Sequence, residues 1–158
     1  YVAVEHEGNT QASDEEVEKI KEIAEGLIGT RYWPDEDGNE RIITWNDILI
    51  VAPYNFQVNK LRAALDENSN IGSVDKFQGQ ETPIVILSMC ASDATECPRG
   101  INFLFSKNRL NVALSRAQAL AIVVGSPALA NTSVNNLNQM ELVNFYCEIV
   151  GTQDKKNI

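Results

Sequence analysis

The chain has 158 residues, of which 44% are hydrophobic, 22% are charged and 7% are aromatic. This length favours a single domain with its own core, and the composition excludes collagenous, low-complexity and wholly disordered chains. No apolar run approaches the ~20 residues of a membrane helix and no signal peptide begins the chain, so we expect no membrane partner.

The net charge of −9 is unevenly distributed. Residues 1–40 hold 12 acidic and 3 basic side chains, so the remainder of the chain is neutral overall. The stretch from 99 to 116 has no acidic residue and contains Arg99, Lys107, Arg109 and Arg116. Salt screening limits the reach of the acidic end to about 8–10 Å, so this basic stretch can still bind phosphate.

The predicted elements alternate between strands and helices. A short strand is expected at residues 1–5, and Ser13 with Glu16 has the spacing of a helix capping box. A helix follows, which Gly29 ends, and a turn-rich connection spans residues 33–39. The apolar residues at helical intervals in that helix are Val17, Ile20, Ile23, Ala24 and Leu27.

The central part of the chain has buried strands. Residues 48–52 form a continuous apolar run, which is typical of a strand covered on both faces. Val58, Leu61 and Leu65 mark the inner face of the next helix. Further strands are expected at 71–74, 84–89 and 120–125, with a helix from about 107 to 116.

A closing helix carries Leu137, Leu142, Phe145 and Ile149, and residues 152–158 are a polar tail. This alternation predicts an α/β fold with a mainly parallel sheet and helices on both faces. Loops that leave parallel strands meet at the carboxyl edge of the sheet, where ligands bind. We therefore expect the functional residues to gather there.

Three segments combine polar and apolar residues in patterns that resemble a known family. They are APYNFQ at 52–57, SVDKFQGQE at 73–81 and RLNVALSRA at 109–117. In this order they resemble motifs IV, V and VI of superfamily 1 helicases, most closely group B, which includes the nonsense-mediated-decay RNA helicase and replication helicase-nucleases. The resemblance is close over residues 46–130.

The resemblance implies a RecA-like three-layer sandwich of the P-loop NTPase type, formed by residues 1–151 as the second RecA-like domain of the helicase. The chain itself has no G-x-x-x-x-G-K-[ST] phosphate loop and no strand that ends in a magnesium-binding acidic pair. Because the chain begins with Tyr1, we expect a piece of a longer protein. Alone, this piece is expected to bind no cofactor tightly and not to hydrolyse ATP.

The resemblance implies one set of residues for ATP. Arg116 matches the motif VI arginine finger, the catalytic residue, because a permanently charged forked side chain stabilises charge on the γ-phosphate. The alternative role for Arg116 is a structural salt bridge. Glu81 matches an acid near the ribose, and Gly79 allows a close backbone approach. Gln80 replaces a residue that is often basic, and Gln57 is a weaker candidate.

A second set is implied for single-stranded nucleic acid. The set is Pro53, Tyr54, Asn55, Ser73, Val74, Asp75, Lys76 and Arg109. Tyr54 either stacks on a base or packs internally. Asp75 suits a cap better than a phosphate contact. Arg109 either contacts phosphate or holds motif VI against motif V through an acidic partner.

The implied function is the C-terminal motor domain of an ATP-dependent helicase that moves 5′ to 3′, with DNA favoured over RNA. The expected cofactors of the complete enzyme are ATP and Mg²⁺. Its expected partners are single-stranded nucleic acid, an N-terminal RecA-like domain and, in some relatives, a fused nuclease. The alternative is a non-catalytic nucleic-acid-binding or partner-docking module that retains the fold. An oxidoreductase is disfavoured because G-x-G-x-x-G is absent.

The cysteine and histidine contents bound the remaining chemistry. Cys90, Cys97 and Cys147 are odd in number and lack metal-ligand spacing, which favours a reducing, cytoplasmic location. His6 is the one histidine of the chain, so multi-histidine metal sites are excluded. We expect no metal site within this chain and three inert thiols.

Overall fold

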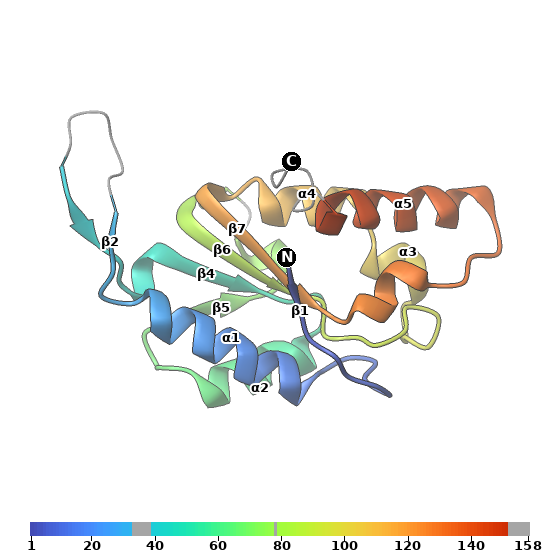
Figure 1. The fold of residues 1–158 in the computed structure, drawn as a ribbon, viewed down its shortest axis with the longest axis horizontal. Helices are drawn as coiled ribbons and strands as arrows, with labels where there is room; N and C mark the ends of the chain where they lie inside the picture. The colour runs from blue at the N-terminus through green and yellow to red at the C-terminus, as the bar shows by residue number, and fades with distance from the viewer. Residues whose placement is uncertain (33–38, 78, 152–158) are drawn as a thin grey trace.

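The computed structural model describes residues 1–32, 39–77 and 79–151, and within them the chain forms three layers (Figure 1). The middle layer is a five-stranded sheet in which every neighbouring pair is parallel. Its order is β1 (Val2–Ala3), β7 (Ala117–Gly125), β6 (Thr82–Ser88), β4 (Ile48–Val51) and β5 (Asn70–Gly72). The predicted α/β RecA-like class with a mainly parallel sheet is confirmed.

The sequences of the central strands are continuous apolar runs because helices cover both faces of the sheet. Ile48 and Ile50 pack into one core with α1 (Asp14–Leu27) and α2 (Asn55–Ala64). Leu49 and Val51 point the other way, as successive strand residues do, into a second core. That core is covered by α3 (Gly100–Leu104), α4 (Lys107–Leu114) and α5 (Leu137–Gly151). Figure 1 shows the two helical layers on opposite sides of the sheet.

The helix starts follow local polar residues. The Ser13 hydroxyl accepts a hydrogen bond from the Glu16 backbone N–H at 3.1 Å, as the predicted cap of α1 requires. The Glu16 carboxylate does not complete a capping box, because it turns into the protein interior and is fully buried. Ser106 caps α4 by accepting from the Arg109 N–H at 3.5 Å.

Some boundaries differ from the expectation. β5 ends at Gly72, two residues early, where an added Cβ would lie 2.7 Å from the Phe77 ring. The chain therefore turns directly into the 3₁₀ segment η2 (Val74–Phe77). β7 begins three residues early because Ala117 already pairs with Thr82 of β6. β1 has only two residues.

The antiparallel hairpin of β2 (Arg31–Tyr32) and β3 (Arg41–Ile42) was not expected, and Figure 1 shows it projecting from the body. The predicted turn at 33–39 lies mostly outside the described residues, and the predicted tail at 152–158 lies wholly outside them. Two further 3₁₀ segments, η1 (Trp45–Asp47) and η3 (Pro127–Asn131), complete the described elements. Within the described ranges, no helix is both long and apolar enough to cross a bilayer.

Candidate functional site

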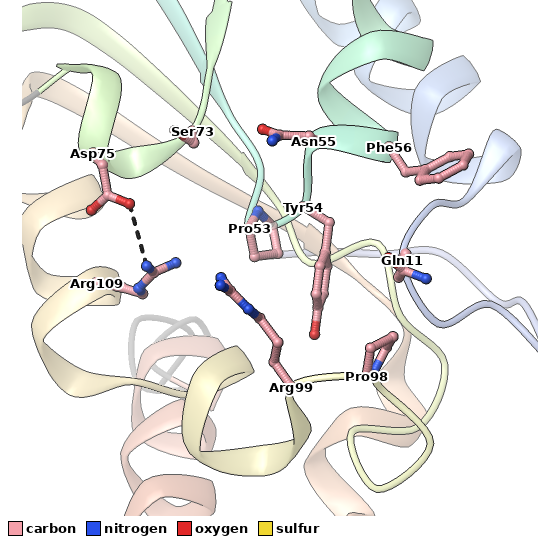
Figure 2. Close-up of a pocket in the computed structure, with 10 residues that line it drawn as sticks. All are labelled: Gln11, Pro53, Tyr54, Asn55, Phe56, Ser73, Asp75, Pro98, Arg99 and Arg109. Carbon is pink, nitrogen blue, oxygen red and sulfur yellow. Dashed lines mark hydrogen bonds and ion pairs between the residues drawn. The ribbon is translucent and has the colours of Figure 1, made fainter.

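An open pocket of about 370 Å³ lies at the carboxyl edge of the sheet, beside the loops that follow β4 and β5 (Figure 2). Six of the eight residues predicted to bind nucleic acid line it. They are Pro53, Tyr54, Asn55, Ser73, Asp75 and Arg109. Segments more than 50 residues apart in sequence thus meet in one place, as the parallel topology requires. We call this pocket the groove.

The Arg109 side chain links two walls of the groove. Its Nη2 lies 3.3 Å from Oδ2 of Asp75, so α4 is tied to η2 (Figure 2). Of the two alternatives for Arg109, the structure contains the ion pair with an acidic partner, which joins the 109–117 segment to the 73–81 segment. The structure shows this pairing in place of the predicted cap role of Asp75, because no backbone N–H of the described residues donates to the Asp75 carboxylate.

Phe103 of α3 forms an aromatic support beneath the groove. The guanidinium carbons of Arg99 and Arg109 lie 4.4 and 4.2 Å from its ring centroid, within the range of cation–π attraction. The Tyr54 ring packs 5.2 Å from the same centroid at an interplanar angle of 47°.

Tyr54 is only 6% exposed, so its ring is occupied by internal packing. Burial raises the pKa of the Tyr54 hydroxyl well above its usual value, and the group therefore stays neutral. This favours the packed tyrosine over the base-stacking one. The neighbouring Phe56 is 66% exposed on the groove, and the sequence analysis missed it although it lies within the same motif.

Two predicted residues of the motif V segment do not line the groove. Val74 is buried, and Lys76 places its ammonium 5.1 Å from the Phe77 ring centroid and 3.5 Å from the Ile71 carbonyl oxygen. Lys76 faces a different hollow, beside Arg62. In this conformation neither side chain reaches a strand lying in the groove.

Gln57 departs from its predicted role near the nucleotide. The side chain is fully buried, and its Oε1 accepts from the Ser13 N–H at 2.8 Å. Its Nε2 donates to the Ser13 carbonyl at 3.2 Å and to the Ser88 hydroxyl at 2.9 Å. Gln57 therefore joins α2 to the start of α1, and a nucleotide at the surface cannot reach it in this conformation.

The interior behind the groove contains a polar network that the sequence analysis did not foresee. The Glu16 carboxylate accepts from the Ser88 hydroxyl at 2.6 Å and from the Cys90 N–H at 2.9 Å. His6 Nε2 lies 2.9 Å from the same carboxylate, and His6 Nδ1 lies 2.7 Å from the Ser92 hydroxyl. The network fixes the end of β6, where Cys90 adopts a φ of +53°.

Arg116 and the Gly79–Glu81 segment lie elsewhere, at the amino edge of the sheet. The Thr82 N–H donates to the Arg116 carbonyl at 2.9 Å, which holds Arg116 next to the residue that follows Glu81. The expectation that all functional loops gather at the carboxyl edge is wrong for these residues, because they precede β6 and β7. One side chain of the motif, Gln78, lies outside the described residues.

The amino edge has features suited to an anion. Gly79, Gln80 and Glu81 are exposed, and Gly79 has a φ of +88°, a conformation that favours glycine. Arg116 is partly buried, and its Nε is buried with no hydrogen-bond partner among the described residues. The Arg116 guanidinium is always charged, and a charge of this sign attracts a phosphate.

In the described parts of the chain, no three His, Cys, Asp or Glu side chains cluster in a way that could hold a metal ion. All three cysteines are free: Cys90 and Cys97 are buried and Cys147 is partly exposed.

Comparisons with known proteins point to one family. Residues 3–128 match the model of a family described as an AAA domain. Over 132 residues, which are 74% of this chain, it is 35% identical to "Putative helicase mov-10-B.1" of Danio rerio. It is 42% identical over 82 residues, half of the chain, to the DNA polymerase alpha-associated DNA helicase A of Schizosaccharomyces pombe. It is 39% identical over 92 residues, 54% of the chain, to the RNA helicase Mov10l1 of Homo sapiens.

The matched regions amount to 13%, 12% and 8% of these three relatives, respectively. The chain therefore spans a small part of the length of each.

Proposed function

Because this chain belongs to the AAA-domain family and its relatives are named helicases, we propose that it is the second RecA-like motor domain of an ATP-dependent superfamily 1 helicase. The groove at the carboxyl edge forms part of the track for single-stranded nucleic acid. The amino edge faces ATP bound by a neighbouring RecA-like domain. Arg116 is the arginine finger.

The single observation that carries the proposal is the separation of the two predicted sets. Six predicted strand-binding residues line one groove, whereas Arg116 and Gly79–Glu81 lie together at the opposite edge of the sheet. A motor needs these functions at separate places that are rigidly joined, because nucleotide-dependent closure must shift the grip on the strand.

Arg116 fits the finger role by its surroundings. Arg116 is partly buried, and its Nε has no hydrogen-bond partner among the described residues. ATP with Mg²⁺ supplies the phosphoryl group and neutralises part of its charge, and the chain without a phosphate loop would leave most of that binding to the neighbouring domain. Gly79 and Glu81 would approach the nucleotide from the same edge, with Glu81 near the ribose and Gln80 beside it.

The identity of the strand and the direction of movement are the finer parts of the proposal. The names of the relatives include both a DNA helicase and RNA helicases. Movement from 5′ to 3′ and a preference for DNA therefore stay predictions, to be tested with DNA and RNA substrates bearing either overhang. A fused nuclease and a cytoplasmic location also stay predictions.

The deciding experiment uses the complete protein that contains this chain. We expect strand-stimulated ATP hydrolysis, and we expect Arg116→Ala to lower kcat on the order of 10³-fold while ATP binding is largely retained. The finger acts on charge that develops during transfer, so turnover suffers more than affinity. Arg31→Ala, in the exposed hairpin, is the control with the same change of charge.

Unchanged turnover in Arg116→Ala would refute the finger assignment. A complete protein that binds strands but never hydrolyses ATP would instead support the non-catalytic binding module.

A further inference from the structure

Arg99 lies outside the three motif segments yet contributes to the groove. It precedes α3, and Figure 2 shows its side chain rising from the start of that helix with its guanidinium pointing into the groove, towards Pro53 and Arg109. The exposed side chain is held over the Phe103 ring at 4.4 Å rather than extended into solvent. Its head group is therefore positioned before any ligand arrives.

The groove has more positive than negative charge. Its charged lining residues are Arg99, Arg109 and Asp75. Asp75 lies 3.3 Å from Arg109, and no carboxylate of the described residues lies within 4 Å of the Arg99 guanidinium. Two guanidiniums share one aromatic ring, and one of them is left without a counterion. Such a site attracts an anion.

The remaining lining residues suit a polynucleotide backbone. Asn55 and Ser73 supply neutral hydrogen-bonding groups, and the exposed Phe56 ring offers a face on which any base can stack. None of these three side chains is charged, so none of them forms a charged hydrogen bond with the edge of a particular base. The combination of one free cation, small polar groups and an exposed aromatic ring is that of a site for a single strand.

We propose that Arg99 is the principal phosphate-binding cation of the groove, with Phe103 as its positioning residue, whereas Arg109 remains paired with Asp75. The ligand is the phosphodiester backbone of a single strand, of RNA or DNA. This inference rests on the proposed function, since it names a contact within the same track.

The test measures binding of fluorescein-labelled rU and dT 12-mers to the complete protein over a range of salt concentrations. Each phosphate contact on a single strand contributes about 0.7 to the slope of log K against log salt. We expect Arg99→Ala to reduce that slope by about 0.7 and to weaken binding about tenfold at low salt. Equal effects on rU and dT are expected, because both have the same phosphate.

Three variants separate charge from structure. Arg99→Lys keeps the charge and should retain the wild-type slope. Phe103→Leu keeps both guanidiniums, so it should weaken binding without changing the slope. Arg31→Ala removes a positive charge from the hairpin, outside the groove, and should leave the slope unchanged.

An unchanged slope in Arg99→Ala, or an Arg99→Lys variant that behaves like Arg99→Ala, would overturn the inference while leaving the proposed function intact. A loss confined to rU or to dT would also contradict a phosphate contact. Failure of the wild-type protein to bind either strand would instead refute the proposed track.

Discussion

Gln57 is fully buried, whereas the adjacent Phe56 is 66% exposed. Both lie in the first turn of α2, where each residue is rotated by about 100° from the last, so neighbours face opposite environments. The sequence predicted an accessible Gln57 and indicated no role for Phe56. Gln57 can be buried because the fold places Ser13 and Ser88 where they form hydrogen bonds with its side-chain amide.

The three thiols should differ in reactivity because they are buried to different extents. Burial raises the pKa of the Cys90 and Cys97 thiols, and it also raises the pKa of the more accessible Cys147. A raised pKa keeps a thiol protonated and unreactive until the pH rises further. With a chromogenic disulfide reagent at pH 8, we expect Cys147 to react first and Cys90 last.

Single Cys→Ser variants of the 158-residue chain assign each phase, and the denatured chain gives its total of three thiols. Reaction of Cys90 as fast as Cys147 in the native protein would contradict the buried placement of Cys90.

At the scale of elements, apolar patterns predicted the sheet well. The runs around Ile48 and Ile84 are buried on both faces, and this pattern leaves few alternatives to a central parallel strand. The strands of the β2–β3 hairpin have two residues each and α3 has five, too short for any periodicity to register. The site was predicted where motifs supplied residues. Arg99 was noted only as part of the basic stretch from 99 to 116, because no motif contains it.

The Glu16 network gives a prediction about how elements are joined. Glu16→Gln leaves the shape of the side chain but removes acceptor capacity from a buried cluster with Ser88, Cys90 and His6. We expect the free energy of unfolding to fall by about 3 kcal/mol, as when one partner of a buried charged group is lost. Denaturant titration followed by circular dichroism measures the change.

Glu18→Gln is the matched control, because this exposed residue lies on the same helix and its loss changes the charge equally. A Glu16→Gln variant as stable as Glu18→Gln would show that the network contributes little.

At the scale of the whole molecule, the two sites belong to one rigid sheet but neither is complete. On the proposed function, the groove is one part of a strand track, and the amino edge offers an arginine to a phosphate loop that this chain lacks. The acidic excess lies in residues 1–40, and of their described parts, 1–32 and 39–40, only Gln11 lines the groove. The negative total charge is therefore compatible with binding of an anionic strand at this site.

We expect the 158-residue chain alone to show no ATP hydrolysis and to bind single strands weakly, with a steep dependence on salt. On the proposed function the chain has only part of the track, so it makes few contacts, and its phosphate contacts weaken as salt is added. Fluorescence anisotropy at several salt concentrations and a phosphate-release assay test both expectations. Tight, salt-insensitive binding by the isolated chain would indicate a self-sufficient recognition module instead.

Helix α4 has eight residues, which correspond to about 12 Å, and the two sites lie at its two ends. Arg109, near its start, is ion-paired with Asp75 in the groove wall, and Arg116 follows its end at the amino edge of the sheet. A short hydrogen-bonded helix resists bending, so displacement of one end must displace the other. On the proposed function, we expect Val112→Gly, midway along α4, to make the helix more flexible and to weaken the coupling between ATP hydrolysis and movement along the strand.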